Sequence, residues 1–464
     1  MIRRLFPLIA VLVITCGCPR PVQYSRPALP VPDAWPEKSA SPAAPAAPAV
    51  DVKWQEFFTD QRLQSVIELA LANNRDLRIA TLNVERVQAL YQIQRAQLYP
   101  TISASVSAEG YRVPRTVSGA ADNETVAQIT IGLGTASWEL DFFGRIRSLR
   151  SAALEQYLAT EQARTAAQIS LIAAVANTYL VLASDHENLK LAQVTLDAQQ
   201  SSYDLILRSR DLGISSDLDL EQAKSQVDVA RVDIARYSGQ IALGENALNL
   251  LVGAPVAAGL LSDDLAKAGA VKDIEAGLPS DVLLRRPDIL AAEHQLMAYS
   301  ANIGAARAAF FPRISLTAAV GVISNDLTNL FKPAAGTWDV APQAILPIFD
   351  YGARKANYRV AEVDRDMAIA TYERAIQGAF REVSDSLSLR TTLVAQQDAL
   401  QSLVNSLEET YRLSETRYKA GMDSYLSVLV AQRSMYAAQQ RLVEIRLARL
   451  SNLVTLYKVL GGGA

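Results

Sequence analysis

The sequence has few of the residues that build disulfides and metal sites. Its 464 residues include two cysteines and two histidines. Cys16 and Cys18 both lie near the N-terminus, so the remainder of the chain has no disulfide framework. His186 and His294 are far apart, and neither has a second candidate ligand beside it, which favours surface or packing roles. The motifs of phosphate loops, zinc proteases and nucleophile elbows are also absent, so we expect no enzyme, no metal site and no cofactor.

The sequence also lacks an excess of one charge, and long apolar runs occur only at its start. The 45 basic and 48 acidic residues give a net charge of −3, which provides no basic field for nucleic acid. Met1–Thr15 (MIRRLFPLIAVLVIT) has two arginines before an apolar stretch of roughly ten residues, too short to cross a bilayer as a helix. We interpret residues 1–17 as a signal peptide for export.

The end of this signal has the pattern of a lipid-attachment site. Thr15-Cys16-Gly17-Cys18 resembles a bacterial lipoprotein box, and Cys18, which follows a glycine, is the better candidate for acylation. The alternative is ordinary signal cleavage without a lipid. Residues 18–58 are rich in Pro, Ala and Ser, and proline donates no backbone hydrogen bond, so we expect an extended, lipid-anchored N-terminal segment.

The rest of the chain contains an internal repeat. An offset of 212 residues places Pro100-Thr-Ile-Ser on Pro312-Arg-Ile-Ser, and an offset of 208 places Gly213 on Gly421. Self-similarity at a fixed spacing indicates two copies of one structural unit. We therefore predict a first repeat at 59–255, an equatorial linker at 256–282 and a second repeat at 283–464.

Each repeat is expected to contain one moderate helix and two very long ones. The predicted helices are Leu63–Leu98, Gly144–Arg210 and Ser215–Leu251, then Pro287–Phe310, Ala353–Lys419 and Tyr425–Leu460. The longest patterns continue for about 67 residues, which is roughly 100 Å of helix. A globular core cannot cover such a helix, so neighbours must pack along it as in a coiled coil.

Between the helices, each repeat has two segments in which apolar and small polar residues alternate. After Pro100, Ile102 and Val106 share one face, while Ser103 and Ser105 share the other. A period of two with one small polar face is typical of half-buried strands. The fourth segment is weakened by Pro342, which cannot donate to a sheet ladder. Pro100 and Pro312 mark where each helix ends and a strand begins.

Strands of about ten residues with one apolar face suit a transmembrane barrel around a wet lumen. A soluble sandwich would show the same alternation, but this chain has nothing to form the second sheet. Four strands cannot close a barrel, and open edges are not tolerated in lipid. The pattern therefore predicts an obligate homo-oligomer, in which a trimer would share twelve strands.

Five motifs carry a resemblance to a known family: LLRRPDILAAE (Leu283–Glu293), NIGAARAAFFPRISL (Asn302–Leu316), SWELDFFGRIR (Ser137–Arg147), LPIFDYGARKANY (Leu346–Tyr358) and RYKAGMDSYLSVL (Arg417–Leu429). Together they resemble the outer membrane factor family, the TolC/OprM-like (NodT-type) efflux ducts. The resemblance implies a mainly α fold, with a long periplasmic α-helical barrel and four strands per protomer in a trimeric twelve-stranded outer-membrane β-barrel. It also implies two partners, a periplasmic adaptor and an inner-membrane efflux pump.

The resemblance also implies roles for the predicted helix turns. Gly213 and Gly421 would lie at periplasmic tips that dock the adaptor. Tyr418 and Asp219 match a side-chain link between neighbouring helix pairs that keeps the tip closed. Leu426 matches an apolar constriction, and Arg433 follows about two turns later on the same helix.

The tip departs from the family pattern in one respect. Ser427 and Val430 occupy positions where the family commonly has a ring of acidic residues. Asp217, Asp219 and Asp423 would then supply the negative charge. The alternative for all these residues is helix capping and a solvated turn.

These observations predict a passive exit duct that conducts drugs or other toxic compounds delivered by the pump. Its aperture would be an equilibrium between closed and open tips, shifted by the adaptor. Two alternatives stay open. One is an exit duct for copper or silver ions, and the other is a structural coiled-coil envelope lipoprotein without a pore.

Overall fold

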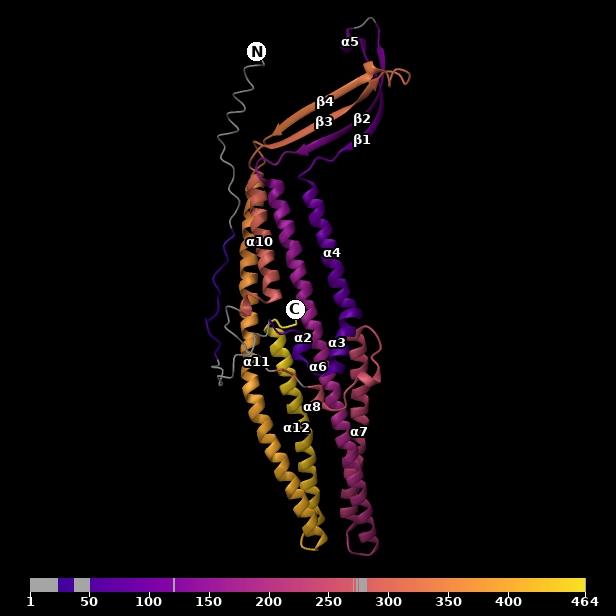
Figure 1. Cartoon of the computed structure of the whole chain (residues 1–464), viewed down its shortest axis with the longest axis vertical. Helices are drawn as coiled ribbons and strands as arrows, with labels where there is room; N and C mark the ends of the chain where they lie inside the picture. Colours follow the sequence, from indigo (N-terminus) through magenta and orange to yellow (C-terminus); the bar gives the residue numbers. More distant parts are fainter. Residues whose placement is uncertain are drawn as a thin grey trace. The chain divides into compact units, whose positions relative to one another are not determined.

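The computed structural model describes residues 24–36, 51–119, 122–269, 271–272, 274 and 282–463. These residues form mainly helices, with one four-stranded sheet in the described part of the chain (Figure 1). The chain divides into two compact units. Unit 1 comprises Met1–Pro27, Val84–Thr160 and Ala292–Tyr372, and unit 2 comprises Ala28–Asn83, Glu161–Ala291 and Glu373–Ala464.

The same order of elements occurs twice. The first series is α4 (Arg75–Ala96), β1 (Ser103–Val113), β2 (Glu124–Glu139), α6 (Arg145–Asp211) and α7 (Asp217–Val252). The second series is α10 (Pro287–Ala308), β3 (Arg313–Ser324), β4 (Gly336–Ile345), α11 (Ala353–Lys419) and α12 (Tyr425–Val459). The four long helices begin and end within two residues of the predicted bounds, so these predictions are confirmed.

Short helices occupy the connections. They are α2 (Trp54–Phe57), α3 (Gln61–Asn73), α5 (Arg115–Ser118), η3 (Ala258–Leu260), α8 (Leu265–Ala268) and η4 (Pro333–Ala335). The prediction of a single helix at Leu63–Leu98 was wrong, because α3 and α4 are separated at Asn74. The backbone of Asn74 is extended, its Oδ1 accepts from the Leu77 N–H at 2.8 Å, and its Nδ2 donates to the Leu251 carbonyl at 2.7 Å. Asn74 therefore caps α4 and attaches it to the end of α7.

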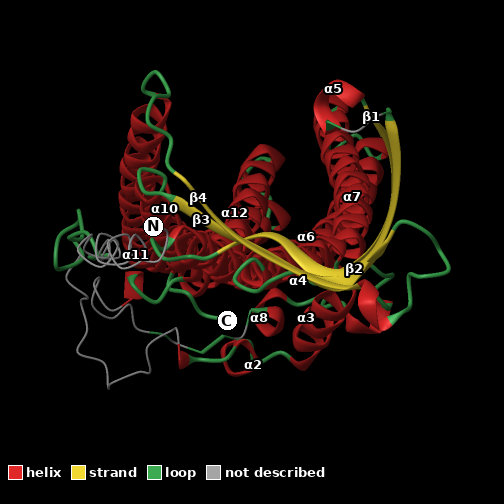
Figure 2. Ribbon diagram, turned by 90° about the horizontal axis from the view of Figure 1, so that it is seen from above, coloured by secondary structure: helices red, strands yellow, loops and turns green. Residues whose placement is uncertain are grey.

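In unit 1 the four strands form one curved antiparallel sheet in the order β1-β2-β3-β4 (Figure 2). The predicted weakness at Pro342 does not end β4, which contains this residue opposite Leu316. Within the described chain β4 is an edge strand, where a missing N–H donor is tolerated.

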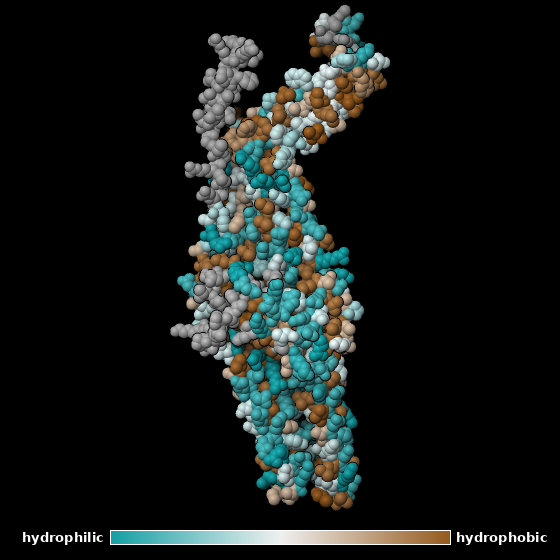
Figure 3. Space-filling view, viewed as in Figure 1, coloured by the Kyte–Doolittle hydropathy of each residue, from teal (hydrophilic) through white to brown (hydrophobic). Residues whose placement is uncertain are grey.

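The strand register separates the two predicted faces. Val106 lies opposite Ile131, which lies opposite Val322, so one face collects the apolar residues of three strands. On the other face Ser105 lies opposite Gly132, which lies opposite Gly321. Hydrophobic residues accordingly gather over the strands in the space-filling view (Figure 3).

Unit 2 contains the largest apolar core. Phe57 stacks on Tyr457 with ring centroids 4.0 Å apart, and the Tyr457 hydroxyl donates to the Val52 carbonyl. The middle of α6 packs in the same core, including Tyr179, whose hydroxyl hydrogen-bonds to the Leu260 carbonyl at 3.0 Å. Segments from both ends of the chain thus support α6 where its composition is most apolar.

Candidate functional site

The two helix turns of unit 2 are built on glycines with left-handed backbones. Gly213, between α6 and α7, has φ of 73°, and Gly421, between α11 and α12, has φ of 72°. A side chain at either position would be strained although space is open around both. Next to Gly213, Leu212, Ile214 and Leu218 are exposed, so this turn presents apolar side chains to its surroundings.

Asp219 is engaged at the N-terminus of α7. Its carboxylate accepts from the Ser216 backbone N–H at 3.1 Å and from the Ser216 hydroxyl at 2.7 Å, while its own N–H donates to the Ser216 hydroxyl. This reciprocal arrangement is a capping box. Asp219 therefore has the helix-capping role that was the alternative prediction. Among the described residues, no hydrogen bond links Asp219 to Tyr418.

Tyr418 instead packs beside Tyr425, at a ring-centroid distance of 5.7 Å. Both belong to a small apolar cluster that joins the two helix turns and includes Ile206, Leu220 and Leu429. Tyr425 is buried and its hydroxyl has no hydrogen-bond partner among the described residues. Burial, with smaller contributions from Tyr418, Tyr411 and Asp219, raises the pKa of Tyr425 to about 12.

Tyr425 was missed from the sequence. The signal that could have identified it is its position as the first residue of α12, opposite the predicted Tyr418 across the Gly421 turn. The cluster places the rings of Tyr418 and Tyr425 and the buried Tyr425 hydroxyl at the point where the two helical hairpins meet. Such a contact can exist in two arrangements, joined or parted.

An ion pair closes the turn between α11 and α12. Arg417 donates to Asp423 through Nε at 2.6 Å and Nη2 at 3.1 Å. The hydrogen bonds from this guanidinium hold the pKa of Asp423 below its usual value. Asp217 lies 3.9 Å from Nε of Arg210 in a solvent-exposed pair. Of the three carboxylates predicted to carry charge at the tip, Asp217 and Asp423 thus have an arginine partner, whereas Asp219 is paired with Ser216.

Leu426 and Arg433 share an exposed face of α12, together with Val430. Residues at this spacing lie on one side of a helix. The predicted constriction residue is therefore free to meet another surface. Cys18 lies outside the described residues. Of the histidines, the Nδ1 atom of His294 lies 2.7 Å from a carboxylate oxygen of Glu155, in unit 1.

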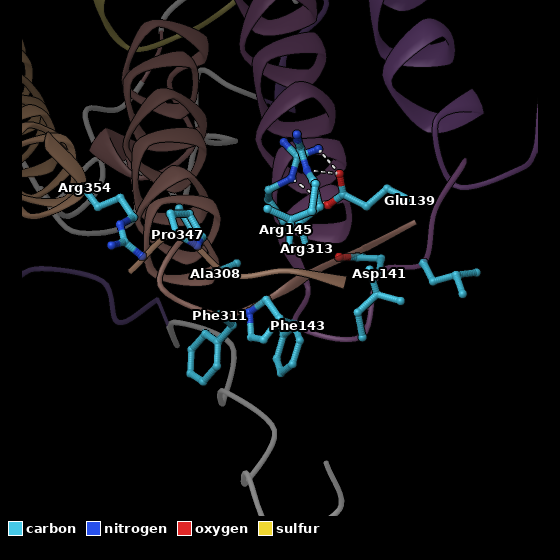
Figure 4. Close-up of a pocket in the computed structure, with 14 residues that line it drawn as sticks. Glu139, Asp141, Phe143, Arg145, Ala308, Phe311, Arg313, Pro347 and Arg354 are labelled. Atoms are coloured by element: carbon cyan, nitrogen blue, oxygen red, sulfur yellow. Dashed lines mark hydrogen bonds and ion pairs between the residues drawn. The ribbon is translucent and has the colours of Figure 1, made fainter. Parts of the chain in front are cut away.

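Unit 1 has a cavity of about 340 Å³ where strands and helices meet (Figure 4). Its lining includes the ends of β2, β3 and β4 and the adjacent ends of α6, α10 and α11. Phe143 and Phe311 stack beside it at 4.9 Å, and Arg145 and Arg313 both contact Glu139. Sequence analysis did not identify this site, although Phe143, Phe311 and the three charged residues lie within the quoted motifs.

A family model described as outer membrane efflux protein matches residues 66–254 and 278–462. The chain belongs to this family. It is therefore an outer-membrane efflux channel and not an enzyme, which confirms the predicted class. The alternative of a pore-free scaffold is not supported by this membership.

Relatives of this channel match over nearly their whole length. The toluene efflux pump outer membrane protein TtgC of Pseudomonas putida is 44% identical, over 100% of this chain and 96% of its own. The cation efflux system protein CusC of Escherichia coli is 40% identical, over 99% and 98%. The open-state structure of the MtrE channel of Neisseria gonorrhoeae has a TM-score of 0.86 and 38% identity, covering 95% of this chain and 97% of its own.

Proposed function

We propose that three copies of this channel join their sheets into one twelve-stranded barrel that crosses the outer membrane. The observation that carries this proposal is the state of the sheet edges. In the described chain, β1 pairs only with β2, and β4 pairs only with β3, so each sheet has two open edges. Val106, Leu133, Val320 and Val340 are exposed on its apolar face. An apolar face is compatible with lipid, but the unpaired backbone N–H and C=O groups of an open strand edge are not. Pairing between copies would satisfy these groups and leave the apolar face directed to the lipid.

Exposed aromatic residues at both ends of the strands support a membrane position. On the helical side they are Tyr99, Phe142, Phe349 and Tyr351, and at the far side they are Tyr111, Phe331 and Trp338. Membrane barrels have such aromatic girdles at their two interfaces, because these rings favour the headgroup region. The strands of 10 to 16 residues between the girdles are long enough to cross the hydrocarbon core when tilted.

We further propose that the turns of unit 2 form the periplasmic gate. Tyr418, Tyr425 and Asp219 would hold the hairpins together in the closed state, with Asp217 and Asp423 as charged neighbours. Leu426 and Arg433 would face the pore or an adjacent copy from the exposed side of α12. Gly213 and Gly421 would present the tips to the adaptor, and differential binding of the adaptor would shift the gate toward its open state.

The cargo is proposed from the relatives: organic solvents and other toxic compounds, delivered by an inner-membrane pump through a periplasmic adaptor. Residues 1–17 would direct export, and acylation of Cys18 would anchor the mature chain in the outer membrane. The 40% identity to CusC favours a second candidate, an exit duct for copper or silver ions. Intact-mass measurement of the mature protein tests the acylation, because a lipid adds a defined mass to a chain that begins at Cys18.

Two measurements on the purified channel test the assembly. Native mass spectrometry should give three chains per particle, and planar bilayers should show discrete conductance steps. Tyr418→Ala is expected to raise the mean conductance, because it removes the ring that packs beside Tyr425 at the closed tip. Particles with one chain, or trimers that never conduct, would contradict the proposal.

The cargo is tested in a deletion strain. Sensitivity to toluene and antibiotics should rise, and the wild-type gene should restore resistance. Sensitivity confined to copper and silver would instead establish the second candidate.

A further inference from the structure

The cavity at the junction of strands and helices in unit 1 has one apolar wall. Phe143 and Phe311 stack with an interplanar angle of 13°, and the apolar residues Pro312, Ile345 and Pro347 also line the cavity. An apolar cavity of about 150 Å³ is large enough for benzene. The volume of about 340 Å³ here leaves room for a larger aromatic ring system with a polar substituent.

The other wall of the cavity is cationic. Arg145 and Arg313 both pair with the single carboxylate of Glu139, at 2.8 Å and 2.7 Å. The cavity is lined by three arginines, including Arg354, and by two acidic residues, Glu139 and Asp141. Arg354 is also paired with Asp350, and Asp141 with Arg147. With these partners included, four positive charges against three negative charges leave an excess of +1. An anion entering the cavity would therefore be attracted rather than repelled.

Guanidinium donors remain available for such an anion. Arg313 contacts Glu139 through Nε, and Arg354 contacts Asp350 through Nε at 2.6 Å. Among the described residues, neither arginine has a hydrogen bond from an Nη group. A carboxylate accepts from guanidinium groups in a charge-assisted manner, which is stronger than a neutral hydrogen bond.

The strand register decides which side of the sheet this charge occupies. Glu139 lies opposite Ser315, and Arg313 lies opposite Ile345. Because alternate residues of a strand share a face, Arg313, Ser315 and Glu139 all lie on the small polar face. In the proposed barrel this face is directed to the water-filled lumen. The occupant would therefore come from the lumen rather than from the lipid.

We propose that this cavity binds small aromatic carboxylates in transit through the channel. The ring would lie against Phe143 and Phe311, and the carboxylate would accept from Arg313 and Arg354. This inference rests on the proposed function, since it needs the polar face to line the lumen. It assigns a class of cargo to a site whose lining contains none of the tip residues.

Equilibrium dialysis of the full-length channel in nanodiscs of zwitterionic lipid tests the site, with empty nanodiscs as the blank. The probe is 2-naphthoate, which carries both a ring and a charge. Acetate carries only the charge, and 2-naphthylmethanol carries only the ring. Wild type should retain 2-naphthoate above the blank and bind both other probes at least ten-fold more weakly.

Three variants distinguish the effect of charge in the cavity from a general loss of folding. Arg313→Gln should weaken 2-naphthoate binding about ten-fold, because it removes the excess charge. Glu139→Gln should strengthen binding, which a misfolded variant would not do. Arg359→Gln, at an exposed α11 position paired with Glu362 and outside the cavity lining, is the matched control and should bind as wild type does.

Equal affinity of wild type and Arg313→Gln, or equal binding of 2-naphthoate and 2-naphthylmethanol, would overturn the inference. The conductance of the same preparation separates this failure from failure of the proposed function. A conducting channel that does not bind 2-naphthoate refutes only the cargo site. A preparation that does not conduct refutes the lumen on which the site depends.

Discussion

The buried carboxylate of Glu293 has hydrogen-bond partners from a distant part of the chain. Its side chain is 4% exposed, and it accepts from Arg26 through Nε and Nη2, both at 2.7 Å, and from the Tyr24 hydroxyl at 2.9 Å. All three residues belong to unit 1. A buried carboxylate is costly without a partner, so the segment that follows the proposed lipid anchor satisfies a charge on α10.

We expect Arg26→Ala to destabilise unit 1 by about 2 kcal/mol, below the full cost of breaking a buried pair because Arg26 is half-exposed. Thermal unfolding and limited proteolysis near residue 26 provide the measurement. The double variant Arg26→Ala/Glu293→Gln should recover part of the loss, since no buried charge is then unpaired. Additive effects of the two substitutions would contradict this coupling.

Tyr425 gives a pH prediction at the same scale. Its folded pKa of about 12 lies above the ordinary value of 10. The neutral hydroxyl is favoured by the fold, so its contribution to stability is fully present below pH 10 and is lost as the pH rises from 10 through about 12. Burial also raises the pKa of other tyrosines, among them Tyr179, Tyr436 and Tyr457, so the difference absorbance of tyrosinate should show several late-titrating groups. Tyr425→Phe should lower the late amplitude by one tyrosine. If the variant keeps the full late amplitude, the assignment fails.

At the scale of elements, the start of α7 combines two roles in Asp219, capping and the proposed gate. Asp219→Ala removes the capping box and any charge-dependent contact at the tip, and should raise mean conductance while lowering stability by about 1 kcal/mol. Ser216→Ala is the matched control, because it breaks the cap but keeps the carboxylate. Conductance should then stay near the wild-type value. An equal rise in both variants would show that capping alone keeps the tip closed.

The separation of α3 from α4 is another property of elements. Asparagine is compatible with a helix interior, so the hydrophobic periodicity alone predicts an unbroken helix through Asn74. The break depends on the Leu251 carbonyl, 177 residues later in the chain, which accepts from the Asn74 side chain. By contrast, Gly213 and Gly421 were predictable, because their left-handed backbones are local requirements that glycine meets at little cost.

At the scale of the whole molecule, the proposed barrel requires the two faces of the sheet to have different environments. Val106→Arg places a charge on the apolar face and should cost about 2–4 kcal/mol near the bilayer midplane. Ser105→Arg, one residue earlier, places the same charge on the polar face and should be tolerated. The measurement is the yield of folded oligomer in outer-membrane fractions. Equal losses in both variants would show that the apolar face does not meet lipid.

The sequence alone determined the long helices, their glycine turns, the two-residue alternation of the strands and the family, because each depends on residues that are near one another in the chain. Only the tertiary structure decided which residues of the two repeats meet. It paired β2 with β3, stacked Phe143 on Phe311, buried Tyr425 beside Tyr418 and enclosed Glu293 with Arg26. Such contacts join positions whose separation in the chain carries no periodic signal, and their energies come from burial and charge pairing that exist only after folding.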